Sequence, residues 1–317
     1  MAATDVPPLR IPDDLVVWAA SDIHGQLGPV DRLLARAGLT DGGDRWTAAP
    51  GTALVITGDI VDRGPDSVGL VRRLVSLRDQ APGAGGMVAL LEGNHEMQVL
   101  GGLAGQDRLF RALLAFGGGA TLLSAGMAPG EWTGMGAAAI RARVDALAPD
   151  FEPALWTFAP YARWRDVLFV HGGPVPGRDL DAFEHGAARL WIRDAFFASP
   201  EPFPSGAGWA PYRDAGIARV VYGHTPVERA TAIHDGHALN VDTWRGGVVS
   251  LARIPAEGDL GAATVLTEPA EPRATDDDPA AVAEARAYDA HLPGDVDAWL
   301  EAVGTDHPRL GTDHPRR

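Results

Sequence analysis

The feature that most constrains the fold is a short apolar run that ends abruptly in charged residues. Residues 53–56, Ala-Leu-Val-Ile, are followed at residues 58–64 by Gly-Asp-Ile-Val-Asp-Arg-Gly. The apolar run predicts a buried parallel strand, and ligands of open α/β sheets bind beyond the carboxyl ends of such strands. Two carboxylates and a guanidinium in one loop are typical of a site that holds a metal ion and a phosphate. We therefore expect a functional site that includes Asp59, Asp62 and Arg63.

The same order of strand, loop and helix is repeated in the first part of the chain. Short apolar runs predict strands, and apolar residues at helical spacing predict helices after the first two of them. The predicted strands are 15–20, 53–56 and 87–91, and the predicted helices are 27–38 and about 66–75. This order predicts a parallel sheet with right-handed crossovers.

The rest of the main domain changes character. Residues 97–160 are rich in Ala, Leu and Gly and lack patterned strands, which predicts a helical insertion that covers one side of the site. Strands resume after it, and an Asp-Gly turn at residues 235–236 predicts a hairpin. The later predicted strands are 167–170, 219–222, 231–234, 237–241, 247–254 and 262–266. Parallel units first and hairpins later predict two sheets packed face to face in an α/β fold.

The predicted domain organisation is one large domain with an extension at each end. Residues 1–13 are assigned to an N-terminal extension and residues 14–267 to the main domain. Residues 268–317 are acidic and rich in Pro and Ala, and they end in a direct repeat of Gly-Thr-Asp-His-Pro-Arg. They are expected to form a partly disordered C-terminal tail with one helix near residues 278–290.

The composition argues against several classes of protein. A net charge of −15 and a pI of about 5.0 disfavour a general nucleic-acid surface, which needs a basic stripe. Because the chain has no cysteine, disulfides and thiolate metal sites are excluded, and any metal must bind His, Asp, Glu or Asn. No apolar run approaches the ~20 residues of a membrane span, and residues 1–14 lack the layout of a signal peptide. We expect a cytoplasmic protein with no nucleic-acid partner and no membrane partner.

Five predicted strand ends carry side chains that bind hard or borderline metals such as Mn, Fe and Zn. Taken singly, an Asp at a strand end is usually a turn or capping residue, and a lone His is usually a surface or core residue. Five such ends in one chain, most of them flanked by glycine that permits tight approach, are not expected by chance. The residues are Asp22, His24, Asp59, Asn94, His95, His171 and His224.

The motifs that contain these residues resemble, in the same order, those of the PPP family of metal-dependent phosphoprotein phosphatases, especially its bacterial and phage serine/threonine phosphatases. They are Ser-Asp-Ile-His-Gly at 21–25, Gly-Asp-Ile-Val-Asp-Arg-Gly at 58–64, Gly-Asn-His-Glu at 93–96, His-Gly-Gly at 171–173 and Gly-His-Thr at 223–225. The resemblance covers about residues 15–254, and Ser21, where glycine is commoner, is a small departure. It implies a calcineurin-like αββα sandwich of two mixed β-sheets flanked by helices.

The resemblance also implies two metal ions. They are expected to be divalent or transition-metal ions, with Mn²⁺ first and Fe or Zn as alternatives. One ion would bind Asp22, His24 and Asp59, and the other would bind Asp59, Asn94, His171 and His224. A hydroxide shared by the two ions would attack phosphorus in line, without a covalent phosphoenzyme.

Further residues match the part of the family site that contacts substrate. His95 is expected to be the general acid that protonates the leaving-group oxygen, and Asp62 to orient it and favour the imidazolium. The alternative for this pair is that it only braces loops. Arg63 is expected to bind phosphate oxygens bidentately, as a lysine could not. Arg193, in Trp-Ile-Arg-Asp, matches a second phosphate-binding arginine of the bacterial and phage branch, and its alternative is a surface arginine after a helix. Asn94 is also expected to donate to phosphate.

Other conspicuous residues carry weaker signals. His234 and His237 flank the predicted hairpin turn and are expected to be solvated rather than metal ligands. Asp242 is a candidate partner for His224, because metal-binding histidines usually need one. Four tryptophans are expected to pack in the core, and two histidines near the C-terminus to lie in flexible chain: Trp132, Trp156, Trp164, Trp191, His307 and His314.

The expected function is a metal-dependent phosphomonoesterase, specifically a protein serine/threonine phosphatase acting on a phosphoprotein or phosphopeptide. The main alternative is a dinucleoside polyphosphate hydrolase of the diadenosine tetraphosphatase kind, against which the intact Asp62-Arg63-Gly64 sequence argues. A nuclease-like phosphodiesterase is disfavoured because Pro226 stands where that group usually carries a second histidine. A non-catalytic metal-bound binding protein is the remaining alternative, and the filled ligand positions argue against it. The sequence leaves open the physiological substrate, serine/threonine against tyrosine, the native metal and the oligomeric state.

Overall fold

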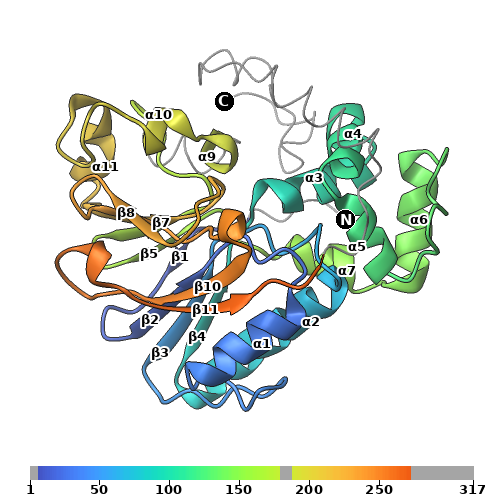
Figure 1. The fold of residues 1–317 in the computed structure, drawn as a ribbon, viewed down its shortest axis with the longest axis horizontal. Helices are drawn as coiled ribbons and strands as arrows, with labels where there is room; N and C mark the ends of the chain where they lie inside the picture. The colour runs from blue at the N-terminus through green and yellow to red at the C-terminus, as the bar shows by residue number, and fades with distance from the viewer. Residues whose placement is uncertain (1–5, 179–187, 273–317) are drawn as a thin grey trace.

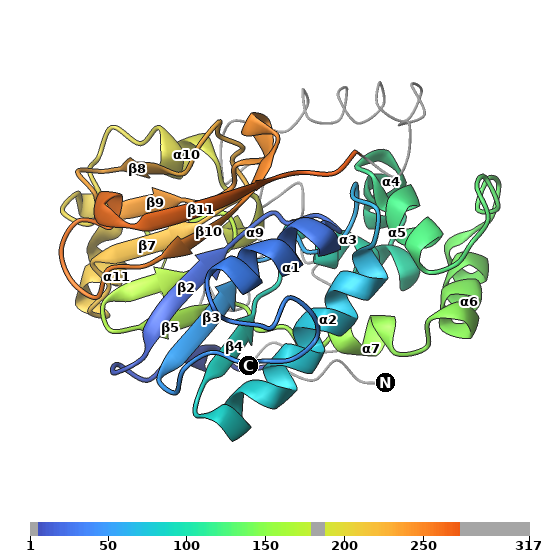
Figure 2. The same cartoon turned by 60° about the horizontal axis from the view of Figure 1, so that its bottom comes forward.

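The computed structural model describes residues 6–178 and 188–272, in which two mixed β-sheets pack face to face with helices on their outer surfaces (Figures 1 and 2). This arrangement confirms the αββα sandwich expected from the sequence. The predicted helix near 278–290, the terminal repeat, His307 and His314 lie outside the described residues.

The first sheet has five strands in the order β11-β10-β2-β3-β4. They are β2 (Val16–Ala20), β3 (Thr52–Ile56), β4 (Met87–Leu90), β10 (Val248–Arg253) and β11 (Thr264–Pro269). β2, β3 and β4 run parallel, as the order of strand, loop and helix predicts. β10 runs antiparallel to β2. The last two strands of the described chain, β10 and β11, therefore belong to the sheet formed by β2, β3 and β4. They do not join β7, β8 and β9 in the second sheet.

The second sheet has six strands in the order β1-β5-β6-β7-β9-β8. They are β1 (Leu9–Arg10), β5 (Ala162–Trp164), β6 (Val167–Phe169), β7 (Arg219–Tyr222), β8 (Thr231–Ile233) and β9 (Ala238–Asn240). β6, β7 and β9 run parallel, so their carboxyl ends meet at one edge. β8 and β9 form the predicted hairpin.

Two short strands of this sheet, β1 and β5, were not expected from the sequence. β1 lies within residues 1–13, which were assigned to an extension, yet it pairs in parallel with β5. Ile11, directly after β1, is completely buried between the sheets. A strand of two residues has too little pattern to be detected, and the pairing with β5 is what holds it.

The alternation of side chains along β3 explains why two hydrophobic layers form. Ala53 and Val55 point into the core between the sheets, where Phe169 and Val221 of the second sheet meet them. Leu54 and the other even-numbered side chains of β3 point the opposite way, into the core beneath the helices. Because both faces of β3 are buried, the strand is apolar at consecutive positions, which explains the continuous apolar run in the sequence.

Two helices cover the outer face of the first sheet, as predicted (Figure 2). α1 (Leu27–Arg36) is followed by Gly38, which adopts a φ of 71° and ends the helix. α2 (Ser67–Gln80) begins after Asp66, whose Oδ1 accepts a hydrogen bond of 2.7 Å from the N–H of Gly69. The cap at Asp66 thus sets where the loop after β3 ends and α2 begins.

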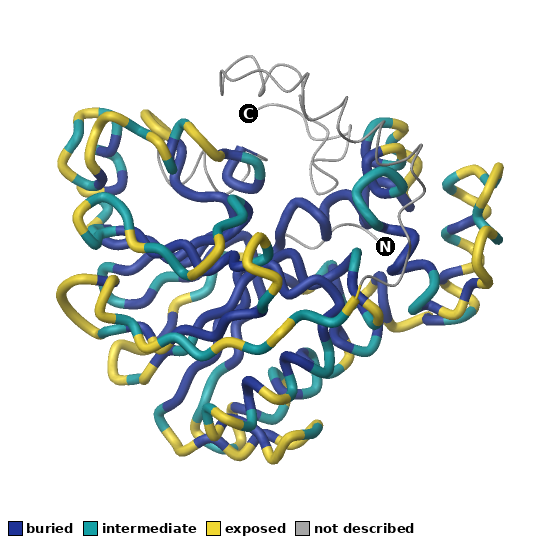
Figure 3. Tube along the Cα trace, viewed as in Figure 1, coloured by how far each residue is buried: buried dark blue, intermediate teal, exposed yellow. Residues whose placement is uncertain are grey.

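The predicted helical insertion corresponds to five helices on one side of the sandwich (Figure 1). They are α3 (Asn94–Leu103), α4 (Asp107–Ala115), α5 (Gly118–Ser124), α6 (Ala137–Leu147) and α7 (Phe151–Leu155). Figure 3 shows that α3 is buried throughout whereas α6 is largely exposed. α3 begins at Asn94, so Asn94 and His95 lie in the first turn of this helix. The sequence had suggested instead that both residues lie in a loop after the strand.

Short helices cover the outer face of the second sheet: α9 (Ala188–Trp191), α10 (Asp194–Phe197) and α11 (Ala210–Asp214). Between α10 and α11 lies a 3₁₀ turn, Ala207–Trp209, which leads directly into α11. The aromatic rings of Phe196, Phe203 and Trp209 contact one another here. Further 3₁₀ turns are Ala81–Ala84, Trp244–Gly246 and Leu260–Ala262.

The end of the described chain still belongs to the sandwich. β11 runs to Pro269, past the predicted boundary at residue 267, and Glu268 pairs with Arg32 and Arg36 of α1. The backbone N–H of Glu271 donates to the side chain of Gln26. Among the helices that the structure describes, none is long and apolar enough to cross a membrane.

Candidate metal and phosphate site

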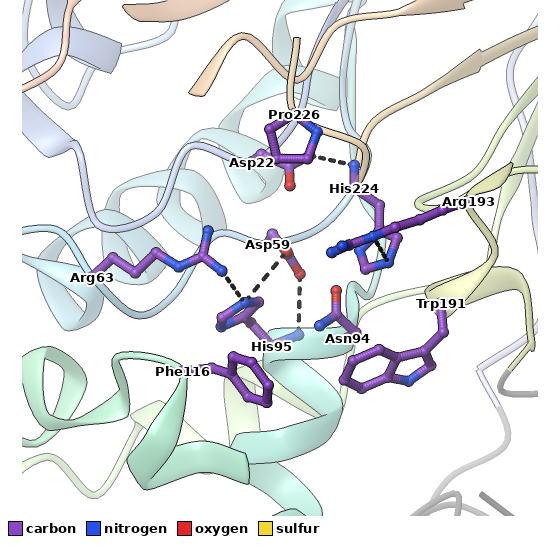
Figure 4. A pocket seen from close by; sticks show the side chains of 10 residues that line it. All are labelled: Asp22, Asp59, Arg63, Asn94, His95, Phe116, Trp191, Arg193, His224 and Pro226. Atoms are coloured by element: carbon purple, nitrogen blue, oxygen red, sulfur yellow. Dashed lines mark hydrogen bonds and ion pairs between the residues drawn. The ribbon is translucent and has the colours of Figure 1, made fainter. Parts of the chain in front are cut away.

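The loops after five strands converge on one pocket at the carboxyl edge of the two sheets. Figure 4 shows the side chains that line it, which come from both sheets and from the helical segments. They are Asp22, Asp59, Arg63, Asn94, His95, Phe116, Trp191, Arg193, His224 and Pro226. The other predicted site residues, His24, Asp62 and His171, are buried and contact this set through hydrogen bonds and ion pairs. The structure therefore brings all the predicted site residues together.

The backbone of the site is strained. Nine non-glycine residues of the described chain have a positive φ, and six of them are predicted site residues: Asp22, His24, Asp59, Asp62, Arg63 and His224. This left-handed conformation is unfavourable for residues with a Cβ, and it persists only where the surrounding structure holds it. Its concentration at one edge of the sandwich is typical of functional sites.

Two glycines allow the loops after β3 and β4 to touch. Gly58 has a φ of 95°, and a Cβ built on it would lie 2.6 Å from the Cα of Gly93. A Cβ on Gly93 would in turn lie 2.2 Å from Oδ1 of Asp59. Only glycine at both positions permits this approach, which places Asp59 beside the first turn of α3.

Asp59 lies between two groups of possible metal ligands. Its Oδ1 is 3.3 Å from Nε2 of His171, and its Oδ2 is 3.9 Å from Nε2 of His24. It belongs to both clusters of ligand atoms found within 4.8 Å of one another, one with His24 and His95 and one with His171 and His224. A carboxylate with one oxygen toward each cluster has the arrangement needed to bridge two cations.

Three histidines are held in the tautomer that a metal requires. Nδ1 of His24 donates to the carbonyl of Val61 at 2.8 Å, and Nδ1 of His171 donates to the carbonyl of Thr57 at 2.9 Å. His224 donates to the backbone of Trp191. Each ring then keeps a lone pair on its other nitrogen.

The same histidines are held neutral. Burial lowers the pKa of His24, His171 and His224, and the positive charge of Arg63 or Arg193 lowers the pKa of His24 and His224 further. A neutral imidazole is the form that binds a metal.

The position of Asn94 fits the same interpretation. Its Oδ1 is 2.8 Å from Nε2 of His171. Because Nδ1 of His171 carries the proton, the lone pair of Nε2 faces the amide oxygen of Asn94, and a cation between the two atoms would make this contact favourable. The residues present therefore fit a metal ion at this place.

The carboxylates lead to the same conclusion. Burial, and then the charges of Asp22 and Glu96, raise the pKa of Asp59 well above its usual range. Buried carboxylates at such short range are unfavourable unless a cation offsets them. Two metal ions would supply that charge.

Glu96 holds the loop after β3 in place. In the sequence it was noted only as the last residue of the Gly-Asn-His-Glu motif, without a role of its own. Its carboxylate is fully buried and accepts hydrogen bonds from the backbone N–H groups of Gly93, Asp59, Ile60 and Val61 at 2.7–3.2 Å. The Glu three residues after Gly93 is the usual signal of a helix N-terminus, so the start of α3 could have been found from it.

His95 and Asp62 form a buried pair beside the pocket. Nδ1 of His95 lies 2.7 Å from Oδ2 of Asp62, and the hydroxyl of Thr121 donates to Oδ1 of Asp62 at 2.6 Å. Burial raises the pKa of Asp62 to about 7, and it lowers the pKa of His95. Thr121 lies on α5, within the predicted helical insertion, so this insertion fixes the pair.

Two arginines enter the pocket from opposite sides (Figure 4). Arg63 donates from Nη1 to Nε2 of His24 at 2.7 Å and from Nη2 to Nε2 of His95 at 3.0 Å. Arg193 donates from Nε to Nε2 of His224 at 3.1 Å. The guanidinium groups therefore face the same space as the ligand atoms, and two such groups in one pocket have the charge and geometry that suit an anion.

Apolar walls of the pocket were not predicted. Phe116, at the end of α4, and Trp191, at the end of α9, line its lower side in Figure 4. Trp191 was expected to be a packing residue. Trp244 contacts the ring of His24 edge-on, with centroids 5.1 Å apart. The sequence offers no signal for these contacts, because they join segments far apart in the chain.

The weaker sequence signals have varied outcomes. His234 and His237 are not solvated as expected, since each is part-buried and bonds a backbone carbonyl, of Phe196 and Ala218 respectively, at 3.0 Å. Asp242 does not bond His224, whose ring bonds the backbone of Trp191 instead. The packing role of all four tryptophans is confirmed, because each packs against a hydrophobic core: Trp132, Trp156, Trp164 and Trp191.

Comparison with known proteins adds a family and several relatives. A family model described as calcineurin-like phosphoesterase matches residues 15–238. Shewanella-like protein phosphatase 2 of Arabidopsis thaliana is 37% identical over 91 residues, which are 29% of this chain and 22% of that protein. A symmetrical bis(5'-nucleosyl)-tetraphosphatase of Acidovorax sp. (strain JS42) is 33% identical over 94 residues, which are 30% of this chain and 28% of that protein. The chain thus matches only about a quarter of the length of these relatives.

The fold is also similar to a solved structure described as a cold-active protein tyrosine phosphatase. The TM-score is 0.54 with 21% sequence identity, and the match covers 84% of this chain and 83% of that one. At this identity the likeness concerns the fold alone.

Proposed function

This chain belongs to the calcineurin-like phosphoesterase family, and we propose that within it the protein is a metal-dependent phosphomonoesterase that dephosphorylates serine and threonine residues of proteins. The observation that carries the proposal is the buried His95–Asp62 pair beside a pocket that also holds two arginines. A serine or threonine alkoxide is a poor leaving group, and a positioned proton donor is what its expulsion requires.

The acidic, basic and amide side chains of the site each have a role in this proposal. Asp22, His24 and Asp59 would hold one metal ion, and Asp59, Asn94, His171 and His224 the other. When bound, the ions would lower the pKa of a water molecule and polarise the phosphoryl oxygens. Arg63 and Arg193 bind the phosphate oxygens and stabilise the negative charge that gathers on them.

His95 then supplies a proton from Nε2 to the oxygen of the leaving alkoxide, while Nδ1 stays bonded to Asp62. The pKa of His95 is low because of burial and the charge of Arg63. A phosphate dianion that enters the pocket brings opposite charge and raises that pKa toward the working range. The acid is thus produced by binding of the substrate.

The second candidate is hydrolysis of a dinucleoside polyphosphate, which the alignment with the bis(5'-nucleosyl)-tetraphosphatase favours. Its leaving group is a phosphate, which departs without a proton, so this reaction has less need of the His95–Asp62 pair. Two aromatic walls, Phe116 and Trp191, are also compatible with a nucleobase.

One comparison separates the candidates. The purified protein, loaded with Mn²⁺, is assayed with a phosphoserine peptide, a phosphothreonine peptide, a phosphotyrosine peptide, diadenosine tetraphosphate and bis-p-nitrophenyl phosphate. We expect the highest kcat/KM on the phosphoserine or phosphothreonine peptide. A higher value on diadenosine tetraphosphate would replace this proposal with the second candidate, and a higher value on bis-p-nitrophenyl phosphate would indicate a phosphodiesterase.

A further inference from the structure

Asp242 is a buried carboxylate that the proposed reaction does not use. It is completely buried, and its Oδ1 accepts a hydrogen bond of 3.1 Å from the backbone N–H of Trp244. Its Oδ2 is buried and has no hydrogen-bond partner. A buried carboxylate oxygen without a donor or a cation is strongly unfavourable, so its retention needs a cause.

The strand register places Asp242 at the edge where the site lies. β7 and β9 run parallel with Tyr222 opposite Asn240, so His224 and Asp242 follow their strands by the same two residues. Asn240 ties the two strand ends together, since its Nδ2 donates to the carbonyl of Thr225 and its Oδ1 accepts from the N–H of Asp242. Asp242 thus occupies the matching position on the neighbouring strand end.

The neighbours of Asp242 belong to one half of the site. The N–H of His224 donates to Oδ2 of Asp22 at 2.9 Å, which fixes Asp22 over the end of β7. Because His224 and Asp242 hold matching positions on neighbouring strand ends, this hydrogen bond brings Asp22 to the side on which Asp242 lies. Trp244, two residues further on, packs against His24. Asp242 therefore lies on the side of Asp22 and His24.

We propose that Asp242 is an additional carboxylate of the metal site formed by Asp22, His24 and Asp59, and that its free Oδ2 faces the ion. The site would then present three carboxylates and one imidazole. This set of mainly oxygen donors suits a hard divalent cation such as Mn²⁺ better than Zn²⁺. The inference rests on the proposed metal centre and is independent of the substrate.

The test uses Asp242→Asn in the full chain. An asparagine keeps the acceptor for the N–H of Trp244 and removes the charge. We expect the metal-free variant to be at least as thermally stable as the metal-free wild type, because an uncompensated buried charge has been removed. The affinity for the more weakly bound Mn²⁺, measured by calorimetric titration, should fall by about 10–100-fold. The rise in Tm on adding Mn²⁺ should be smaller than in wild type.

Asp259→Asn is the matched control, since Oδ1 of Asp259 likewise accepts a backbone N–H two residues on, from Gly261, far from the site. It should leave Mn²⁺ binding unchanged. Unchanged Mn²⁺ affinity in Asp242→Asn would overturn the proposal. So would an equal loss of Tm in the metal-free and Mn²⁺-loaded variant, or failure of the variant to fold, because either shows a carboxylate that only braces the loop. Neither readout depends on the substrate, so the proposed phosphatase activity stands or falls separately.

Discussion

The carboxylate of Glu96 accepts the backbone N–H of Asp59, and through the next two N–H groups it holds the whole loop against the first turn of α3. The side chain of Asp59 in turn accepts the N–H of His95 at 3.0 Å. The loop after β3 and the helix after β4 are therefore bonded in both directions. This arrangement explains how a strained backbone at Asp59 is maintained.

The first prediction is that Glu96→Gln destabilises the protein and weakens metal binding. Oε2 of Glu96 accepts from Gly93 and Asp59, and an amide nitrogen in its place would leave those two buried N–H groups without an acceptor. Each such loss costs ~1–3 kcal/mol. Urea unfolding of the metal-free protein should show the loss.

Glu131→Gln is the control, because the carboxylate of Glu131 also accepts a backbone N–H, that of Ala128, but lies outside the site. It should have a small effect. If Glu96→Gln is as stable as wild type, the hydrogen bonds to Glu96 do not hold the loop.

The sequence predicted the side chains of the site better than the secondary-structure elements that surround and position them. Asp22, Asp59 and His224 follow short, continuous apolar runs, and the parallel order of those runs brings their ends to one edge. The strands β1 and β5 could not be predicted, because they are too short for a pattern and depend on each other for pairing. The helical insertion was predicted only as a whole, without the bounds of α5, which places Thr121 against Asp62.

The partner of His224 was predicted wrongly for an instructive reason. Asp242 has the right chemistry, but the acceptor is a backbone group at Trp191, which carries no side-chain signal. Likewise, the wall formed by Phe116 and Trp191 joins two helical segments whose approach depends on tertiary packing. Residues that act through their side chains at strand ends are visible in the sequence, and contacts made by backbone groups are not.

The second prediction concerns metal content. Elemental analysis of the purified protein should find two metal ions per chain, and chelation should abolish phosphatase activity. Asp59→Asn should reduce the content most among ligand changes, since Asp59 lies within reach of both clusters. His234→Asn, which removes a histidine outside the site, should keep both ions. A single tightly held ion with full activity would refute the two-metal centre.

The third prediction is that Mn²⁺ affinity weakens as the pH falls from 8 to 6. Burial and neighbouring carboxylates raise the pKa of Asp59, so protons compete with the metal increasingly as the pH drops. The pKa of His24 and that of His224 are lowered, so these rings stay neutral and add little to the effect in this range. Competition titrations at pH 6, 7 and 8 should show the trend. A constant affinity would mean that Asp59 is ionised before the metal binds.

The fourth prediction concerns the C-terminal tail. The interactions of Glu268 and Glu271 with α1 and the adjacent Gln26 tie down the end of the described chain, and the proposed domain boundary lies near them. Deletion of residues 278–317 should leave turnover of p-nitrophenyl phosphate within a few-fold of wild type. A deletion from residue 264, which removes β11, should prevent stable folding. Loss of activity in a folded 1–277 protein would place part of the site in the tail.

The last prediction tests His95 as the general acid through the chemistry of the leaving group. p-Nitrophenolate departs readily without a proton, whereas a serine alkoxide is very basic and needs one. His95→Asn should therefore slow hydrolysis of a phosphoserine peptide far more than that of p-nitrophenyl phosphate. General-acid catalysis contributes ~10²–10⁴-fold, and the difference between the substrates should be a sizeable part of that.

Asp62→Asn should show the same pattern more weakly, because Asp62 bonds Nδ1 of His95 and does not reach the substrate. Arg63→Ala is the contrasting variant and should impair both substrates alike, since both bring the same phosphoryl group. Metal content is measured in each variant, because a lost ion would imitate a lost acid. If the fully metallated His95→Asn protein slows both substrates equally, His95 positions the phosphate or the loop and is not the acid.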